Sequence, residues 1–440
     1  MKAKDKQYLF IFMAFIVYMV SYFGKYSYSA NINNIMSLYN VGKAETGVAA
    51  SLFFFAYGAG QIINGLLCKF YNKRIVLSGA LIISAIINLV VYIGIDFVYL
   101  KYLWFLNGFV QSCLWSSIIL AVNENVSYEN LDKAVLALGA TTPVGTACAY
   151  GLSALCVTLG NFKNSFLIAF IILLSVGIIW FLFYNKKAYP AQELANRRAA
   201  KTCEAEKDCE AVKDCESGAN QKENLEKTNK SAKNHIATSM ILTICVIGLF
   251  MMCNSLTRDA LSTWVPAILK ETYNLPNNLS ILLTICLPVA GMGGIYASVA
   301  LKRRKHSDMF ILGVFFAINV LSVVLLIFLM KTDLWVLAIL TMTVSTSCAH
   351  GISNYATSIY PFEISDKLNS GLTSGVLNGC GYIGATICTY SLGAIADAQG
   401  WMYVFYLALL VSVVPMIICF VKTVCKCIKI NKQKCRGEQK

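Results

Sequence analysis

The sequence carries little charge for its length. Charged residues make up 14% of the 440, against roughly 25% in a soluble globular domain, while hydrophobic residues make up 57%. A chain of this composition is not a soluble protein, and it contains many apolar stretches long enough to cross a bilayer. We therefore expect an all-α membrane protein with about twelve transmembrane helices. The expected spans are 8–30, 45–67, 75–95, 99–122, 134–157, 164–184, 237–268, 279–300, 309–330, 334–359, 370–393 and 401–424.

The expected spans lack the residue sets that catalysis needs. They show no paired carboxylates, no nucleophile with its base and no metal cluster, and no glycine loop of the kind that holds ATP phosphates. Cys203, Cys209 and Cys215 stand six residues apart, which matches no zinc pattern, so we expect reduced thiols there. We predict that the protein is not an enzyme and binds no metal or cofactor.

The positive charge is clustered. The formal net charge is +14, and Lys and Arg gather before the first span, in the loops 69–74 and 302–305, and in the tail from Lys422. Clustered Lys and Arg mark the cytoplasmic side, so both termini are expected to be cytoplasmic. We predict a multi-pass protein of the plasma (inner) membrane whose basic loops meet lipid headgroups, and no nucleic-acid partner. The first stretch is too long for a signal peptide core, so no cleavable signal is expected.

One polar segment divides the chain. Residues 185–236 are rich in both charge signs and nearly free of large apolar residues, which is typical of a linker without a packed core. The expected domains are a six-helix bundle at 1–184, a cytoplasmic linker at 185–236, a second six-helix bundle at 237–424 and a basic cytoplasmic tail at 425–440. An offset of 233 residues maps Lys25 onto Arg258, and it maps the basic loop after the second span onto that after the eighth. The two bundles are therefore predicted to be pseudo-symmetric.

Lys25 and Arg258 are cations inside apolar stretches, where a charge is costly and usually faces a cavity, a partner or a substrate. Tyrosines and amides share helix faces with these cations or lie in neighbouring spans, and their groups can donate hydrogen bonds. A site rich in donors suits a phosphate, carboxylate or sulfonate. The candidate substrate-binding residues are Lys25, Arg258, Tyr18, Tyr22, Tyr57, Gln61, Tyr382 and His350.

Each candidate also has a plainer interpretation. Lys25 could extend its ammonium to the membrane surface. Arg258 could form a structural ion pair with Asp259 or another acid, although adjacent side chains on a helix diverge by about 100° and a direct pair is expected to be poor. His350 could serve as an interhelical hydrogen-bonding residue, and amides such as Asn107 could link helices.

Five segments carry a family resemblance. They are SYFGKYSYSANI (21–32), SLFFFAYGAGQIINGLL (51–67), NGFVQSCLW (107–115), TRDALSTWVPAILKE (257–271) and SGLTSGVLNGCGYIG (370–384). The chain resembles transporters of the major facilitator superfamily. More narrowly, it resembles the organophosphate:phosphate antiporters, a group with glycerol-3-phosphate and hexose-phosphate transporters and a hexose-phosphate sensor. The resemblance covers essentially the full length apart from the linker and is most specific from Arg258 to Glu271.

The resemblance implies roles for particular residues. In the family, a basic residue of the first helix and an arginine of the seventh hold the substrate phosphoryl group, and these roles fall on Lys25 and Arg258. Family cavity tyrosines align with Tyr18, Tyr22, Tyr57 and Tyr382.

Five positions depart from the family pattern. Lys25 stands where arginine is usual, Thr142 where the family has a histidine, and Gln61 where some members have a lysine. The positions Lys69-Phe70 replace the usual Asp-Arg pair. Lysine lacks the bidentate fork of arginine, and fewer fixed cations favour a less charged anion than a sugar phosphate.

The predicted function is secondary transport of a small organic anion by alternating access of two rocking bundles. The expected substrate is a phosphorylated metabolite exchanged for inorganic phosphate or moved with protons, by a monomer embedded in membrane lipids. Two alternatives stay open: a carboxylate or other organic-anion facilitator of the same fold, and a non-transporting membrane sensor of a sugar phosphate.

The orientation can be tested through the linker cysteines. Because the clustered Lys and Arg place the linker in the cytoplasm, an impermeant thiol reagent applied to intact cells should leave Cys203, Cys209 and Cys215 unlabelled. The same reagent should label them once the cells are permeabilised. Strong labelling from outside would reverse the orientation.

Overall fold

The computed structural model describes residues 3–184, 240–304, 306–364 and 370–437, which are helical apart from short connections and contain no strand. The expected linker at 185–236 lies outside the described residues. The helices of the first part are α1 (Ala3–Ala30), α2 (Ile32–Tyr39), α3 (Lys43–Leu67), η1 (Cys68–Phe70), α4 (Lys73–Ile93), α5 (Phe97–Asn125), α6 (Tyr128–Thr158) and α7 (Asn164–Phe183). Those of the second part are a helix over 240–255, η2 (Leu256–Leu261), α10 (Ser262–Tyr273), α11 (Asn277–Leu283), α12 (Cys286–Arg303), α13 (Asp308–Leu329), α14 (Trp335–Asn354), η3 (Tyr355–Ile359), α15 (Tyr360–Glu363), α16 (Ser370–Gln399) and α17 (Trp401–Gly437).

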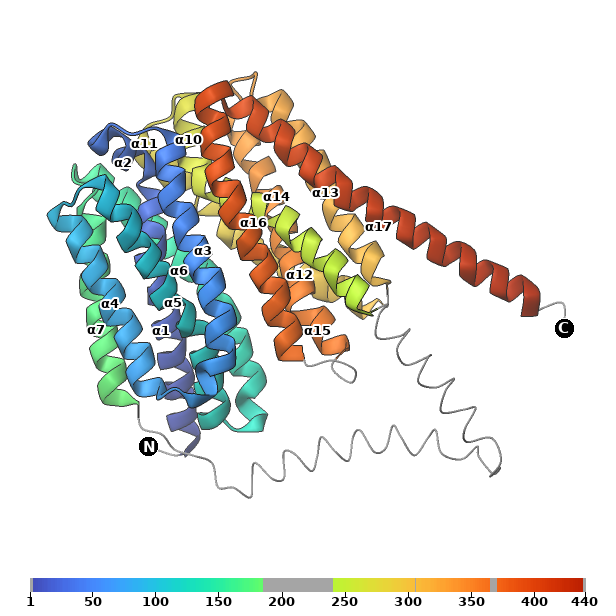
Figure 1. The fold of residues 1–440 in the computed structure, drawn as a ribbon, viewed down its shortest axis with the longest axis horizontal. Helices are drawn as coiled ribbons and strands as arrows, with labels where there is room; N and C mark the ends of the chain where they lie inside the picture. The colour runs from blue at the N-terminus through green and yellow to red at the C-terminus, as the bar shows by residue number, and fades with distance from the viewer. Residues whose placement is uncertain (1–2, 185–239, 305, 365–369, 438–440) are drawn as a thin grey trace.

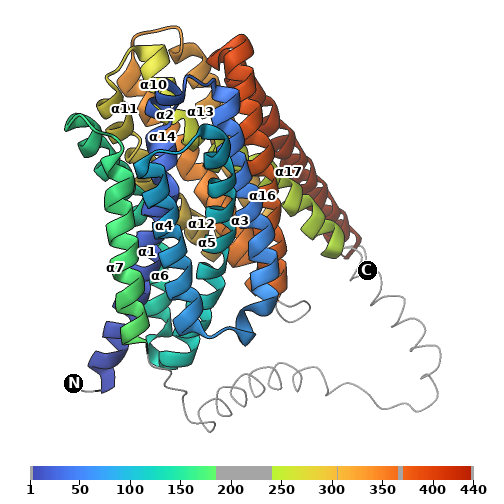
Figure 2. The ribbon, with the colours of Figure 1, turned by 60° about the vertical axis from the view of Figure 1, so that its left-hand side comes forward.

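Eleven segments in the described ranges are long and apolar enough to cross a membrane, from Gln7–Ala30 to Trp401–Lys426. They correspond to eleven of the twelve spans expected from the sequence. The twelfth expected span, 370–393, forms α16, which is 30 residues long. Its Gly, Ser, Thr and Asn content makes it less apolar than the others, and it runs beside α3 (Figure 2). The prediction of an all-α, multi-pass membrane protein is confirmed.

Two groups of helices stand side by side (Figure 1). One contains α1 and α3–α7, and its core packs Phe10 against Trp180 with ring centroids 5.7 Å apart. The other contains the helix over 240–255, α12–α14, α16 and α17, with Phe250 against Phe316 in its core. Short α2 lies at the end of the molecule that also carries α10 and α11. We call this the α2 end.

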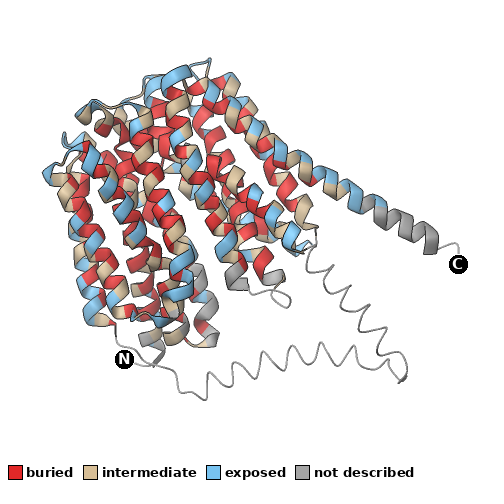
Figure 3. Cartoon of the chain, viewed as in Figure 1, coloured by how far each residue is buried: buried red, intermediate tan, exposed pale blue. Residues whose placement is uncertain are grey.

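The outward faces of the helices carry most of the exposed residues (Figure 3), and many of these are large and apolar. Leu66, Leu182, Leu321 and Leu410 are each more than 60% exposed. Large apolar faces of this kind are unfavourable in water and are covered by lipid in a membrane protein. At one edge, α17 does not end at the expected limit of the last span but continues to Gly437, so the first part of the expected basic tail extends the same helix.

Glycines set the closest helix crossings. A Cβ at Gly294 of α12 would overlap the backbone carbonyl of Ser347 of α14. In the first group, a Cβ at Gly108 of α5 would overlap the carbonyl of Phe53 of α3. Small residues let helix backbones approach closely in membranes, where packing is a main source of helix association. The glycine-rich stretches therefore act as helix-packing positions.

Neighbouring glycines on α12 provide a matched test of this packing. Gly294→Ala should separate α12 from α14 and lower the melting temperature of the purified protein by several degrees, because the added methyl meets backbone. Gly293→Ala should leave the melting temperature nearly unchanged, since its Cβ would lie 3.6 Å from the Ser347 hydroxyl, an ordinary contact. Equal melting temperatures for the two variants would contradict the crossing geometry.

Candidate functional site

Lys25 lies between the two groups of helices and is surrounded by aromatic rings. Its ammonium Nζ is 5.0–5.8 Å from the centroids of five rings contributed by α1, α3 and α16. The rings are those of Tyr26, Phe53, Phe54, Tyr57 and Tyr382. Lys25 therefore does not extend to the membrane surface. Within the described ranges its ammonium forms no hydrogen bond and no direct ion pair, and its nearest contacts are the rings, which attract a cation more weakly than a carboxylate does.

A buried amide cluster holds α1 behind Lys25. Asn107 of α5 donates from Nδ2 to the carbonyl of Gly24 at 2.9 Å, and its Oδ1 accepts from Ser84 of α4 and from Gln111 at 2.7 and 3.0 Å. Gly24 is required here, because a Cβ would lie 2.7 Å from the Ser84 hydroxyl oxygen. Asn107 and Gln111 thus link α1, α4 and α5, as the plainer interpretation of the amides proposed. The turn held at Gly24 directs the next residue, Lys25, toward the rings.

Arg258 stands in η2, a π-helical turn, and pairs with its own neighbour. Its Nε donates to Asp259 Oδ2 at 2.8 Å, its Nη2 lies 2.6 Å from the same oxygen, and its Nη1 donates to Ser353 of α14 at 2.8 Å. The expectation of a poor direct pair was wrong. It assumed α-helical geometry, whereas the wider π turn and the long arginine arm let the guanidinium fold back onto the adjacent carboxylate.

A second polar cluster supports η2. Asn319 of α13 donates to the Ser412 hydroxyl at 3.0 Å and to the hydroxyl of Thr257, the residue before Arg258, at 3.5 Å. Asn254, one turn earlier, donates to Ser353 at 2.9 Å. The Ser353 hydroxyl, which accepts the hydrogen bond from Arg258, is therefore itself positioned by Asn254.

Tyr382 of α16 lies between the two cations. Its ring centroid is 5.8 Å from Lys25 Nζ and 5.9 Å from Arg258 Cζ. The ring also packs at 4.9 Å against Tyr57 of α3. Gly58 makes this approach possible, because a Cβ there would lie 2.6 Å from the Tyr382 Cβ. One aromatic side chain thus joins α3 to α16 and both cations to each other.

The remaining candidate residues contact other side chains of the helix groups. The hydroxyls of Tyr18 and Tyr57 are 3.5 Å apart, and the Tyr22 hydroxyl shares a 2.7 Å hydrogen bond with Thr142. Gln61 accepts from Asn378 of α16 at 2.6 Å, a second link between α3 and α16. His350 packs on α12, where a Cβ at Gly291 would lie 2.5 Å from its Cδ2.

Four residues of the cluster were not among the candidates. Tyr26, Phe53 and Phe54 contribute rings around Lys25, and Asp259 contributes the carboxylate on Arg258. Two of them could have been found by adjacency, since Tyr26 follows Lys25 and Asp259 follows Arg258, whereas nothing in the sequence marks Phe53 and Phe54. Asn354 of α14 donates to Ser298 of α12 at 2.9 Å and so links these two helices.

At the α2 end the two groups of helices are joined by polar contacts. Lys43 at the start of α3 forms ion pairs with Glu271 at 3.1 Å and Asp397 at 3.6 Å. Asn33 of α2 donates to Asn277 at 2.8 Å and to the Pro266 carbonyl at 3.1 Å. The first group is thus fastened to α10, α11 and α16 on this side of the cations.

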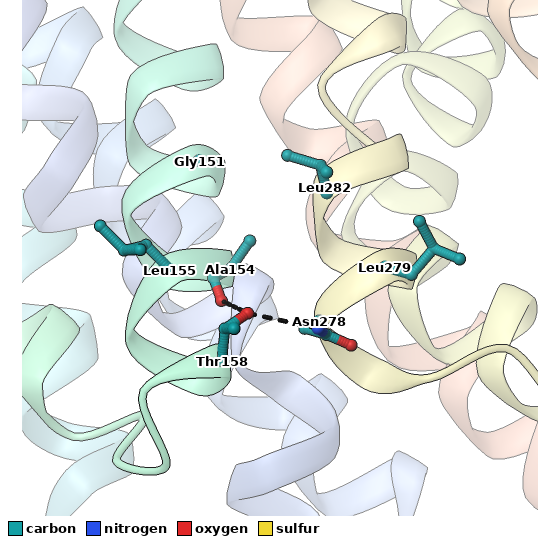
Figure 4. A pocket seen from close by; sticks show the side chains of 7 residues that line it. All are labelled: Gly151, Ala154, Leu155, Thr158, Asn278, Leu279 and Leu282. Carbon is teal, nitrogen blue, oxygen red and sulfur yellow. Dashed lines mark hydrogen bonds between the residues drawn. The ribbon is translucent and has the colours of Figure 1, made fainter.

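A cavity of about 280 Å³ lies between α6 and α11 near the same end (Figure 4). Its walls are mostly apolar, with Leu155 and Leu282 exposed at its mouth, and one hydrogen bond of 3.2 Å from Asn278 to Thr158 crosses it. It contains neither cation and is separate from the aromatic cluster.

A multi-span helical membrane protein with two enclosed cations beside one ring between its helix groups has the organisation of a transporter. The chain belongs to the Major Facilitator Superfamily, whose model matches residues 14–387. It is therefore a membrane transporter and not an enzyme.

Named relatives are similar over most of the chain. The "Probable hexose phosphate transport protein" of Chlamydia pneumoniae is 20% identical over 420 residues, covering 93% of this chain and 89% of the relative. "Sugar phosphate exchanger 3" of Mus musculus is 23% identical over 407 residues, covering 83% and 77%. Among solved structures, a bacterial homologue of the human lysosomal transporter Spinster, inward-facing and unoccupied, superposes with a TM-score of 0.69 at 10% identity, covering 94% of this chain and 95% of that one. This last likeness shows the fold alone.

Proposed function

We propose that this transporter is a secondary antiporter that exchanges a phosphorylated metabolite for inorganic phosphate. The observation that carries the proposal is the position of Lys25, an ammonium held among five rings with no carboxylate partner in the described structure, 5.8 Å from a ring that also contacts Arg258. A cation without a counter-ion away from water is costly, and an anionic substrate would remove that cost. The relatives named for hexose phosphate and sugar phosphate support a phosphate ester as that anion.

In this proposal the two cations bind the phosphoryl group from opposite helix groups. Lys25 offers three N–H donors, and Arg258 keeps two of its five N–H groups beyond the three that bond Asp259 and Ser353. Tyr382 lies beside both cations, and Tyr57 lies beside Lys25 and packs on Tyr382. Tyr18 contacts both Tyr57 and Tyr22. Gln61 and His350 are proposed to meet the rest of the substrate.

Binding from both sides would draw the helix groups together around Tyr382 and favour the switch between access states. The Lys and Arg clusters support an orientation with both termini in the cytoplasm, and we propose the plasma membrane as its location.

Exchange itself is tested with purified protein in lipid vesicles. Vesicles loaded with inorganic phosphate should take up radiolabelled phosphate, and a panel of phosphate esters should compete with that uptake. Vesicles loaded with sulfate should show much lower uptake, because no counter-substrate is present. Uptake that carboxylates inhibit and phosphate esters do not would replace the proposal by an organic-anion facilitator, and binding without uptake would indicate a sensor.

The cations are tested by substitution. Lys25→Gln and Arg258→Lys should each weaken binding of inorganic phosphate by about tenfold to a hundredfold, since a charge-assisted contact is worth roughly 1.5–3 kcal/mol. Arg258→Lys is damaging because lysine cannot make the forked contacts of a guanidinium. Lys25→Arg should retain binding.

Lys101→Gln is the matched control for these variants. This lysine also contacts a ring, that of Phe97 at 5.4 Å, but it stands in the first turns of α5 and away from the cation cluster. Its loss should leave phosphate affinity unchanged. Normal affinity in Lys25→Gln would remove Lys25 from the site and with it the main support for an anionic substrate.

A further inference from the structure

Asp259 covers one edge of the Arg258 guanidinium. Its Oδ2 lies 2.8 Å from Nε and 2.6 Å from Nη2, the two nitrogens of the side that would otherwise grip a phosphoryl group with two parallel hydrogen bonds. The pair is well enclosed, with side-chain exposures of 11% for Arg258 and 9% for Asp259. A phosphoryl group bound to Arg258 therefore meets a guanidinium whose forked edge already holds a carboxylate.

The charges of the cluster follow from this pairing. Lys25 and Arg258 contribute two positive charges and Asp259 one negative charge, which leaves a fixed charge of +1 for these three residues. A singly charged phosphoryl group balances that charge. A doubly charged one leaves a net negative charge beside the Asp259 carboxylate, which is only 9% exposed and lies in a cluster of aromatic rings, where charges are screened less than in water.

We propose that Asp259 is a specificity-determining residue that makes the site select singly charged phosphate groups, such as phosphodiesters and monoanionic phosphate, over dianionic monoesters. The proposal rests on the function proposed above for Lys25 and Arg258, and it names the charge class of the substrate. Asp259 takes no part in gripping the anion. It limits how much negative charge the two cations can accept and confines the substrate to the donors of Arg258 that remain uncovered.

Two small esters test the charge class directly. At pH 8 methyl phosphate is a dianion, because the second pKa of a phosphate ester is near 6, whereas dimethyl phosphate has one ionisable oxygen and remains a monoanion. Both are measured as competitors of radiolabelled inorganic phosphate on the purified protein at that pH. The wild-type protein should bind dimethyl phosphate at least as tightly as methyl phosphate, even though the diester has fewer charges to offer the cations.

Asp259→Asn should reverse this order. Removing the negative charge raises the fixed charge to +2, so affinity for methyl phosphate should rise relative to dimethyl phosphate by about tenfold or more, the effect of one charge-assisted contact. Asp259→Glu keeps the charge and should keep the wild-type order. Asp333→Asn, which removes an exposed carboxylate in the turn before α14, is the matched control for charge loss and should also keep it.

An unchanged ratio in folded Asp259→Asn would overturn the proposal. A wild-type protein that binds methyl phosphate tenfold or more tightly than dimethyl phosphate would also overturn it. This second measurement uses the wild-type protein alone and does not depend on a variant that folds. In both cases loss of phosphate binding in Lys25→Gln would still support the proposed function. If the wild-type protein binds neither inorganic phosphate nor either ester, the proposed function and the role of Asp259 fall together.

Discussion

The site depends on one repeated interaction, a buried amide that holds the residue before each cation. Asn107 donates to the carbonyl of Gly24, and Asn319 donates to the hydroxyl of Thr257. Gly24 and Thr257 are related by the same 233-residue offset that relates Lys25 to Arg258. A buried amide without its partner costs about 1–3 kcal/mol, so each cluster strongly favours a single helix position. The two amides themselves are not related by this offset, since Asn107 lies on α5 and Asn319 on α13, so the supports of the two cations are alike in kind and not in position.

The class of fold was predictable because it follows from composition. Long apolar stretches in a chain with 14% charge leave few alternatives to a bundle of membrane-spanning helices. The two cations were also predictable, since a charge is conspicuous in such a stretch. The residues that contact the two cations could not be predicted in the same way. In a sequence, Phe53 and Phe54 look like ordinary lipid-facing or core residues, and only the folded structure shows that the Lys25 ammonium lies beside their rings on α3.

The Arg258–Asp259 pair shows why local geometry limited the prediction. The angle between adjacent side chains was taken from an α-helix, and a π turn is not evident from residue types alone. Pro266, eight residues further on, cannot donate an amide hydrogen bond to the preceding turn, and this loosens the helix near η2. In contrast, Gln61 and His350 were chosen for their polarity, and the structure places them against α16 and α12 with no direct contact to either cation in the described ranges.

The π turn η2 also has a consequence far from Arg258. A π segment carries about one residue more than the α-helical turn it replaces, and one residue corresponds to a rotation of about 100°. The extra residue therefore sets the rotational phase of α10 relative to the helix over 240–255. In this phase the Trp264 indole donates to the Thr389 carbonyl of α16 at 3.2 Å, and the Pro266 carbonyl faces Asn33. The turn that folds Arg258 onto Asp259 thus also determines which face of α10 meets α2 and α16. The position of the Arg258 guanidinium and the contacts that join the helix groups at the α2 end therefore depend on the same π turn.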